Sequence, residues 1–297
     1  MNRLVDLAYA AAWAVIKRLP EPAAYSVFDR IGQQVWRRRG RGVTQLERNL
    51  RRVLGPALPD ADLRRLSRRA MASYSRYWCE VFRLPVWSDD RVVASVRTEN
   101  EEVLRKELDS GRGVIVPLPH SANWDLAGAW ACLAVAPLTT VAERLRPESL
   151  YDRFVAYRES LGMEVLPADG GREVFTALQA RLRAGGLVCL VADRDLSASG
   201  VEVDFFGETA RMPPGPAALA ISTGACLLPV ALSYERSGMR LRFQNEIAVP
   251  AESTYRQKIS AMSQQLANSY AEGIAAHPQD WHMLQRFWPA DFGGSAP

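Results

Sequence analysis

The sequence lacks the features that define several large classes of protein. Its 297 residues contain no run of 18 uncharged apolar residues, which a membrane-spanning helix requires. The N-terminal stretch has no small-residue cleavage site after a clean apolar core, so we expect no secretory signal and a cytoplasmic protein. The cysteines are far apart and stand among apolar residues, which predicts buried thiols in place of disulfides or a zinc cluster: Cys79, Cys132, Cys189 and Cys226.

Common catalytic motifs are also missing. No Gly-x-Ser-x-Gly elbow is present, which argues against a serine hydrolase of the α/β-hydrolase type. The absence of a Walker loop, of Gly-x-Gly-x-x-Gly after a strand and of His-Glu-x-x-His argues against an NTPase, a dinucleotide enzyme and a zincin. We therefore expect neither a metal nor a cofactor, and a catalytic base would have to act directly on a hydroxyl of the substrate.

Positive charge is concentrated in residues 1–83. This segment has 17 Arg or Lys against 7 Asp or Glu, whereas the whole chain carries a net charge of only +4. Such a surface attracts nucleic acid, anionic lipid headgroups or a phosphorylated ligand, although a simple solvated helical surface is the alternative. The clusters are Arg37-Arg38-Arg39-Gly-Arg41, Arg48-x-x-Arg51-Arg52, Arg64-Arg65 and Arg68-Arg69.

An apolar segment from Leu4 to Leu19 precedes these clusters. It is interrupted by Asp6, contains Trp13 and ends in Lys17-Arg18, a pattern typical of a helix that lies in a membrane interface. Packing into the protein's own core is the competing interpretation. Together with the basic clusters, the segment favours an anionic membrane surface as partner, and no nucleic acid is expected because no binding motif for it accompanies the charge.

The order of the predicted elements indicates an α/β fold with one domain over 1–297. With 48% hydrophobic and 24% charged residues, the chain can bury a substantial core. We expect a helical part at 1–83, a linking stretch at 85–100, and an α/β core at 100–297 with a central, mainly parallel sheet flanked by helices. The predicted strands are 113–118, 138–143, 164–167, 187–192, 201–206, 225–234 and 239–249, and the predicted helices are 122–134, 149–161, 172–184, 215–223 and 253–276.

The segment from His120 to Trp130 carries the strongest functional signal. His120 follows an apolar run that ends in Pro119 and stands at the start of a helical pattern. Asp125 lies five positions later. Within one continuous helix the two side chains would be about 140° apart, so they can meet only if His120 precedes the helix. Ser121 or Asn123 can cap that helix. A histidine held by a carboxylate is a general base, because the carboxylate fixes its tautomer.

Six ordered blocks support a family assignment. The sequence resembles the bacterial lipid A lauroyl/myristoyl acyltransferases and, more closely, the actinobacterial phosphatidylinositol mannoside acyltransferases, which have the glycerolipid acyltransferase-like fold. The resemblance covers nearly the whole chain. The blocks are His120-x4-Asp125, Val141-Ala-Glu143-Arg144, Ala192-Asp193-Arg-Asp195-Leu, Val203-Asp-Phe-Phe-Gly207-Glu, Arg211-Met-Pro-Pro-Gly-Pro216 and Thr223-Gly-Ala-x-Leu-x-Pro229-Val.

The resemblance implies roles for individual residues. His120 would be the base, with Asp125 as the carboxylate of the signature. The position of Asp193 is usually glutamate in the mannoside enzymes and orients the histidine, so which of the two aspartates contacts the ring stays open. As substrate-binding residues we expect Glu143 and Arg158 on the acceptor side, Arg211 in a Pro/Gly-rich turn at a phosphate or headgroup, and also Asn123 and Arg194.

Structural alternatives exist for several of these residues. Asp193 could cap a following helix, Glu143 could pair with a neighbouring arginine, and Arg158 could be an ordinary helix cation. His282 is expected to be a packed core histidine and not a second base.

The resulting expectation is a peripheral enzyme on the cytoplasmic face of the cell membrane, with 1–83 on the membrane and acyl-chain side and 100–297 as the catalytic core. It would transfer a long acyl chain, palmitoyl above all, from acyl-CoA to the 6-hydroxyl of a mannose of phosphatidylinositol mono- or dimannoside. Acyl-CoA is then a donor substrate and not a cofactor, and a coenzyme A thiolate leaves readily enough to need no acyl-enzyme. The alternatives are transfer to another glycolipid or a lysophospholipid, acyl-CoA thioesterase activity, and a non-catalytic lipid- or nucleic-acid-binding module.

Overall fold

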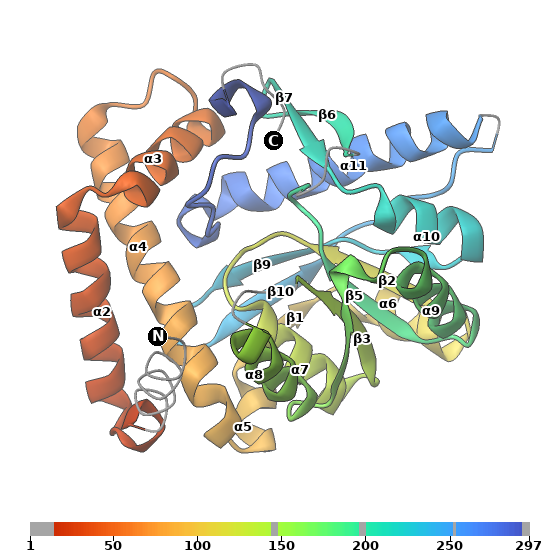
Figure 1. Ribbon diagram of the computed structural model, residues 1–297, viewed down its shortest axis with the longest axis horizontal. Helices are drawn as coiled ribbons and strands as arrows, with labels where there is room; N and C mark the ends of the chain where they lie inside the picture. Colours follow the sequence, from red (N-terminus) through yellow and green to blue (C-terminus); the bar gives the residue numbers. More distant parts are fainter. Residues whose placement is uncertain (1–14, 144–147, 196–199, 252–253, 293–297) are drawn as a thin grey trace.

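The computed structural model describes residues 15–143, 148–195, 200–251 and 254–292. Most of the apolar segment from Leu4 to Leu19, predicted to be interfacial, therefore lies outside the described residues. Three long helices begin the described chain at one side of the molecule (Figure 1): α2 (Glu21–Arg38), α3 (Arg41–Leu54) and α4 (Asp60–Arg83). The predicted helical character of residues 1–83 is confirmed for this described part.

Close packing joins α2 and α4. A Cβ atom at Gly32 would come within 2.2 Å of Ser75 Oγ, so only glycine allows the two helices to approach this closely. The indole of Trp36 in α2 donates a hydrogen bond of 3.0 Å to Ser67 in α4. Apolar residues of α3 and α4, including the buried Leu46 and Leu50, form a small core of their own. In the described part of the chain, no helix has the length and apolar character needed to cross a membrane.

The central sheet has five strands, and all of its pairings are parallel. Its order is β4 (Met163–Pro167), β3 (Leu138–Ala142), β5 (Leu187–Val191), β2 (Val114–Leu118) and β8 (Cys226–Leu227). Parallel strands need crossover connections, which helices supply here. These are α7 (Trp124–Ala134), α8 (Glu148–Glu159), α9 (Gly171–Arg183) and α10 (Gly215–Thr223). The predicted α/β class with a parallel sheet and flanking helices is confirmed.

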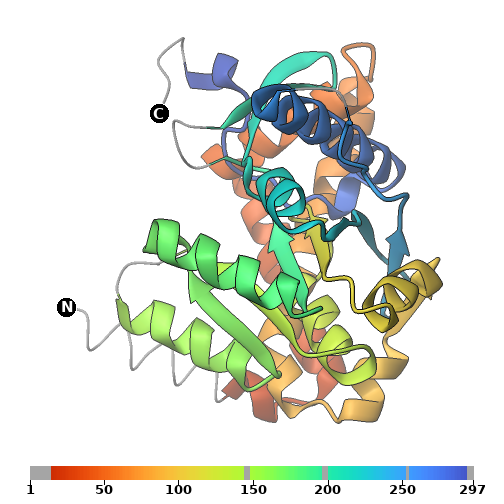
Figure 2. The same cartoon turned by 90° about the vertical axis from the view of Figure 1, so that its right-hand side faces the viewer.

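Two smaller sheets complete the fold. One joins β1 (Val96–Glu99), β10 (Met239–Phe243) and β9 (Val230–Tyr234), and the other is the antiparallel hairpin of β6 (Val201–Phe205) and β7 (Glu208–Met212). Figure 2 shows this hairpin and α11 (Tyr255–Ala276) at the upper end of the molecule, with α8 towards the lower end. The remaining helices are α5 (Asp89–Ala94), α6 (Glu101–Asp109) and the short 3-10 segments Leu84–Val86, Ala168–Gly170, Pro278–Asp280 and Pro289–Phe292.

Four details of the prediction were wrong. The strand predicted at 239–249 ends at Phe243. The stretch 85–100, predicted as a link, contains α5 and β1. The single strand predicted at 225–234 is divided into β8 and β9, because Leu228 and Pro229 carry the chain from one sheet to another. Arg211, predicted in a turn before a helix, lies inside β7 opposite Glu202.

Candidate active site

Predicted site residues follow three adjacent strands of the central sheet. His120 comes two residues after the end of β2, Asp193 two residues after the end of β5, and Glu143 directly after β3. Because β5 pairs with β2 on one side and β3 on the other, and all three strands run parallel, their carboxyl ends meet at one edge. Open α/β sheets place their ligands at this edge. The topology thus brings together residues 73 positions apart.

His120 and Asp193 form the central pair of the site. The Nδ1 atom of His120 lies 2.5 Å from Oδ1 of Asp193, and the backbone N–H of His120 donates to Oδ2 at 3.0 Å. The Asp193 side chain is fully buried, whereas 35% of the His120 side chain is exposed. Burial alone would raise the pKa of the Asp193 carboxyl, but the charge of His120 and the hydrogen bonds from His120 and Trp281 outweigh it and lower the pKa. Asp193 is therefore ionised at neutral pH and holds Nδ1 as the protonated nitrogen, which leaves Nε2 to accept a proton.

The C-terminal segment anchors the loop that carries His120. The indole Nε1 of the fully buried Trp281 donates to Oδ2 of Asp193 at 3.0 Å. The backbone N–H of His282 donates to His120 O at 2.8 Å, and that of Ala122 donates to Asp280 O at 2.9 Å. Ala122 has a positive φ of 49°, a conformation that costs energy in a residue with a side chain. These contacts fix the loop in that conformation.

Asp125 lies in the first turn of α7, yet its carboxylate faces other partners. Its Oδ1 accepts a hydrogen bond of 2.7 Å from Arg158 Nε, and its Oδ2 accepts one of 3.0 Å from the Tyr77 hydroxyl. Burial would lower the pKa of the Arg158 guanidinium, but the charge of Asp125 and the hydrogen bond to it prevail and raise it. Burial, with the charge of Asp125, raises the pKa of the Tyr77 hydroxyl. Of the two aspartates considered from the sequence, Asp193 contacts the histidine ring, and Asp125 binds Arg158 and Tyr77.

The other predicted site residues have different surroundings. Asn123 is fully buried and caps α7, with Oδ1 accepting from Leu126 N at 2.9 Å. Glu143 is exposed and Arg194 half-buried, and both line the cavity described below. Arg211 is half-buried in β7, and its Nη2 lies 3.4 Å from Glu202 Oε1. The backbone O of Arg211 accepts from Asp195 N at 3.2 Å, which ties β7 to the segment after Asp193.

A cavity of about 480 Å³ opens beside His120. This volume is within the range of small-molecule sites, which is about 300–1,000 Å³. Polar groups of the site, including Asp125 and Arg158, contribute to its wall. The rest of the wall is mainly apolar and is supplied by α6, α7 and strands of both larger sheets, with lining residues that include Leu104, Ala131, Leu138, Met163, Leu187 and Phe243. The cavity therefore suits a long apolar group whose reactive end lies at His120.

A second histidine contributes to the cavity wall without being exposed. The Nε2 atom of His282 lies 3.0 Å from Ser73 Oγ, which in turn donates to Asp280 Oδ1 at 2.8 Å. Burial is the main cause that lowers the pKa of His282 to about 3, and the charge of the nearby His120 contributes in the same direction. The ring is therefore neutral and packed among aromatic side chains such as Tyr74 and Tyr77. This agrees with the expectation of a packed core histidine.

Sequence reasoning did not identify two residues of the site. Neither Trp281 nor Tyr77 was among the predicted site residues. Nothing near either residue in the sequence signals its contact with Asp193 or Asp125, because both contacts are long-range. Among the described residues, no group of three His, Cys, Asp or Glu side chains is arranged to hold a metal ion.

The chain is similar to known acyltransferases over nearly its whole length. Residues 1–289 match the family described as bacterial lipid A biosynthesis acyltransferase. The chain is 48% identical over 292 residues to a phosphatidylinositol mannoside acyltransferase of Mycolicibacterium smegmatis, a match that covers 98% of this chain and 93% of the relative. It is 47% identical over 301 residues to the enzyme of the same name from Mycobacterium tuberculosis strain H37Rv, covering 98% and 90% of the two chains.

Proposed function

Because the chain belongs to the bacterial lipid A biosynthesis acyltransferase family and is an acyltransferase, we propose that it moves a long acyl chain from acyl-CoA to a mannose hydroxyl of a phosphatidylinositol mannoside. The acceptor is inferred from the names of the two mycobacterial relatives. Palmitoyl is the proposed chain, and the proposed position is the 6-hydroxyl of a mannose of the mono- or dimannoside. The observation that carries the proposal is the His120–Asp193 pair beside the mainly apolar cavity.

In the proposed mechanism, Nε2 of His120 takes the proton of the acceptor hydroxyl. The oxygen then attacks the thioester carbonyl carbon, and the C–S bond breaks as the tetrahedral intermediate collapses. The thiolate leaves and takes the proton from the imidazolium, which gives an ester and free coenzyme A. Asp193 holds the Nδ1 proton throughout and stabilises the imidazolium, without itself becoming protonated.

The acyl chain is proposed to enter the cavity. Each buried methylene contributes about 0.8 kcal/mol, so an apolar wall that extends from His120 to Leu104 and Phe243 selects a long chain. Arg194, which also lines the cavity, and Arg211 are proposed to contact phosphates of the donor or of the acceptor headgroup. Glu143 and Arg158 are proposed to lie on the acceptor side. Asn123 is proposed to act through the loop and not by touching substrate, because its side chain is fully buried.

The N-terminal helices are proposed to bind the cytoplasmic face of the membrane. Val27, Ile31 and Val35 are exposed and are spaced four residues apart, so they form one apolar row along α2. The exposed arginines Arg37, Arg38 and Arg41 follow at the end of this helix and the start of the next. An apolar row with adjacent cations suits an anionic lipid surface, where each cation contributes about 1 kcal/mol.

An acceptor panel tests the proposal. Purified enzyme is given palmitoyl-CoA with phosphatidylinositol dimannoside, monomannoside, phosphatidylinositol, a lysophospholipid or no acceptor, and the products are identified by mass spectrometry. The proposal predicts an ester on a mannose of the mannosides. Transfer only to a lysophospholipid would support the related-acyltransferase alternative, free fatty acid at the same rate with every acceptor would support a thioesterase, and no turnover would leave a binding module.

A further inference from the structure

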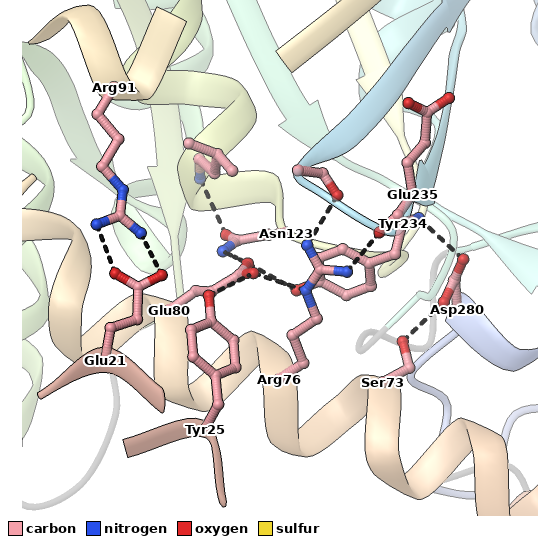
Figure 3. Close-up of polar contacts among 12 residues, drawn as sticks. Glu21, Tyr25, Ser73, Arg76, Glu80, Arg91, Asn123, Tyr234, Glu235 and Asp280 are labelled. Carbon is pink, nitrogen blue, oxygen red and sulfur yellow. Dashed lines mark hydrogen bonds and ion pairs between the residues drawn. The ribbon is translucent and has the colours of Figure 1, made fainter. Parts of the chain in front are cut away.

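A buried carboxylate lies on the far side of the loop that carries His120. Glu80 of α4 is only 1% exposed and accepts hydrogen bonds from four side chains, which belong to α2, α4, β9 and the loop before α7 (Figure 3). The donors are the Tyr25 hydroxyl of α2 at 3.1 Å, Arg76 Nε of α4 at 2.7 Å, Asn123 Nδ2 at 2.9 Å and the Tyr234 hydroxyl of β9 at 3.0 Å. A carboxylate accepts hydrogen bonds at both oxygens, so all four contacts are satisfied together.

Arg76 supplies the countercharge and fixes the position of Glu80. Its Nη1 and Nη2 atoms each donate at 2.8 Å, to the backbone oxygens of Glu235 and Gly238 between β9 and β10. Its guanidinium carbon also lies 3.9 Å from the centre of the Tyr234 ring. Glu80 is therefore joined to the turn after β9 as well as to two helices. Burying the charge of Glu80 costs free energy, and apolar side chains of similar volume would fill the same space without that cost. The cluster therefore suggests a role beyond packing.

Asn123 connects this cluster to the active-site loop. With Nδ2 on Glu80 and Oδ1 on Leu126 N, both ends of its amide are bonded, and the orientation of the side chain is fixed. Asn123 is the N-cap of α7, three residues after His120. The next residue, Trp124, places its ring 5.3 Å from the His120 ring, centre to centre and nearly perpendicular. A shift of Asn123 would therefore move both the wall beside His120 and the strained Ala122 before the cap.

We propose that Glu80 is a positioning residue for catalysis: through Asn123 it holds the start of α7, and with it the orientation of the His120 ring. This inference rests on the proposed function for its kinetic test, but the orientation of His120 can also be observed without turnover. Glu80 touches no substrate. Its effect should appear in kcat and in the His120–Asp193 hydrogen bond, and little in the KM for palmitoyl-CoA.

Three variants separate this role from simple packing. Glu80→Gln places an amide NH2 group against a donor, either Asn123 or Arg76. Asn123→Ser keeps a cap for Leu126, since serine is a good N-cap, but removes the donor to Glu80. The double variant Glu80→Gln with Asn123→Asp reverses the polarity of the contact, so that the introduced glutamine donates to the introduced aspartate while its oxygen still accepts from Arg76 and Tyr25. The matched control is Glu21→Gln, the same change in a carboxylate of α2 that pairs with Arg91 of α5 (Figure 3).

Two readouts are combined. The first is kcat and KM, measured on folded enzyme. The second is the low-field NMR signal of the His120 Nδ1 proton, which is assigned by its loss in His120→Gln. Glu80→Gln and Asn123→Ser should each lower kcat by about 10- to 100-fold and shift the signal, since small misplacements of reacting groups have effects of this size. The double variant should return both readouts towards wild type, to within about threefold in kcat. Glu21→Gln should change neither.

The proposal is overturned if the single variants lower the melting temperature but leave kcat and the signal unchanged, or if the double variant recovers neither readout. If Glu80→Gln does not fold, the kcat and the NMR signal of Asn123→Ser are sufficient to test the proposal. If the wild type acylates no mannoside yet the signal moves in the single variants and returns in the double variant, the proposed function fails and the positioning role stands.

Discussion

Replacing Asp193 by asparagine should abolish catalysis while the fold is kept. Its Oδ2 accepts hydrogen bonds from two N–H donors, His120 N and Trp281 Nε1. In Asp193→Asn, the amide oxygen must therefore occupy the Oδ2 position, and the NH2 group must face Nδ1 of His120. Because that group donates, Nδ1 becomes the acceptor and the ring proton moves to Nε2. The ring then has no free electron pair at the atom that should take the proton.

The expected loss in kcat is about 10³- to 10⁴-fold, the size seen when the same exchange of tautomer is imposed on a Ser-His-Asp triad. This corresponds to about 4–5.5 kcal/mol of transition-state free energy. The free energy of unfolding should fall by only about 1–2 kcal/mol, because neutral hydrogen bonds replace the three charge-assisted ones. Since Nε2 and the cavity keep their places, the KM for palmitoyl-CoA should change little.

The assay is transfer of labelled palmitoyl to phosphatidylinositol dimannoside, with urea denaturation as the measure of stability. Asp125→Asn is the matched control, since it leaves the His120–Asp193 pair intact and weakens the contact with Arg158. It should lower kcat far less than Asp193→Asn does. The assigned role of Asp193 is refuted if folded Asp193→Asn transfers within about tenfold of wild type, or if Asp125→Asn shows the larger loss in kcat.

Three further predictions concern the chain length, the acid stability and the membrane. Gly128→Leu should shift the preference from palmitoyl to lauroyl, with at least about a tenfold fall in the ratio of kcat/KM values, because Gly128 lines the cavity. A Cβ atom there would come within 2.5 Å of Met163 Cε, so the added side chain and the displaced end of Met163 together fill the space of about four methylenes at about 0.8 kcal/mol each. Folding depresses the pKa of His282 from 6.5 to about 3, so the unfolded state binds the proton first and stability falls as the pH drops below 6.5. Urea denaturation should show that His282→Gln removes about 1.5 kcal/mol of the loss between about pH 6.5 and about pH 5. Neutralising Arg37, Arg38 and Arg41 together should weaken binding to vesicles containing phosphatidylinositol by about 10²-fold in a sedimentation assay.

Each of these predictions has a control. Ala134→Leu adds the same kind of bulk to α7 away from the cavity and should leave the chain preference unchanged. An unchanged pH dependence in His282→Gln would contradict the buried neutral state. Neutralising Arg236 and Arg256, which are exposed in the turn after β9 and in α11, should leave vesicle binding intact, and an equal loss there would indicate a general effect of charge.

The sequence predicted the elements around the site better than the contacts between them. An apolar run of 113–118 followed by His120 and a capping residue is a local signal, and β2, α7 and the position of His120 between them are confirmed. The five-residue spacing between His120 and Asp125 also placed Asp125 in the first turn of α7. The spacing does not show which way the Asp125 carboxylate faces, because that depends on its partners Tyr77 in α4 and Arg158 in α8.

The partner of His120 depends on strand order. Asp193 contacts the His120 ring because β5 lies beside β2. The order of parallel strands in a sheet could not be predicted from the sequence, so this contact could not be predicted either. The role of Trp281 is hidden for the same reason, since it reaches Asp193 from 88 positions away. Short elements were missed for another reason. Strand β1 has the polar sequence Val-Arg-Thr-Glu and lies at the edge of its sheet beside β10, so it has neither the length nor the pattern of a buried strand.

The central claim is that His120 acts as the base in transfer of an acyl chain to a mannoside. The most direct test incubates labelled palmitoyl-CoA and phosphatidylinositol dimannoside with the wild type and with His120→Gln, and follows labelled glycolipid over time. We expect acylated mannoside from the wild type and a loss of at least about 10³-fold in the folded variant. Equal transfer by the variant, or a wild type that releases only free palmitate, would contradict the claim.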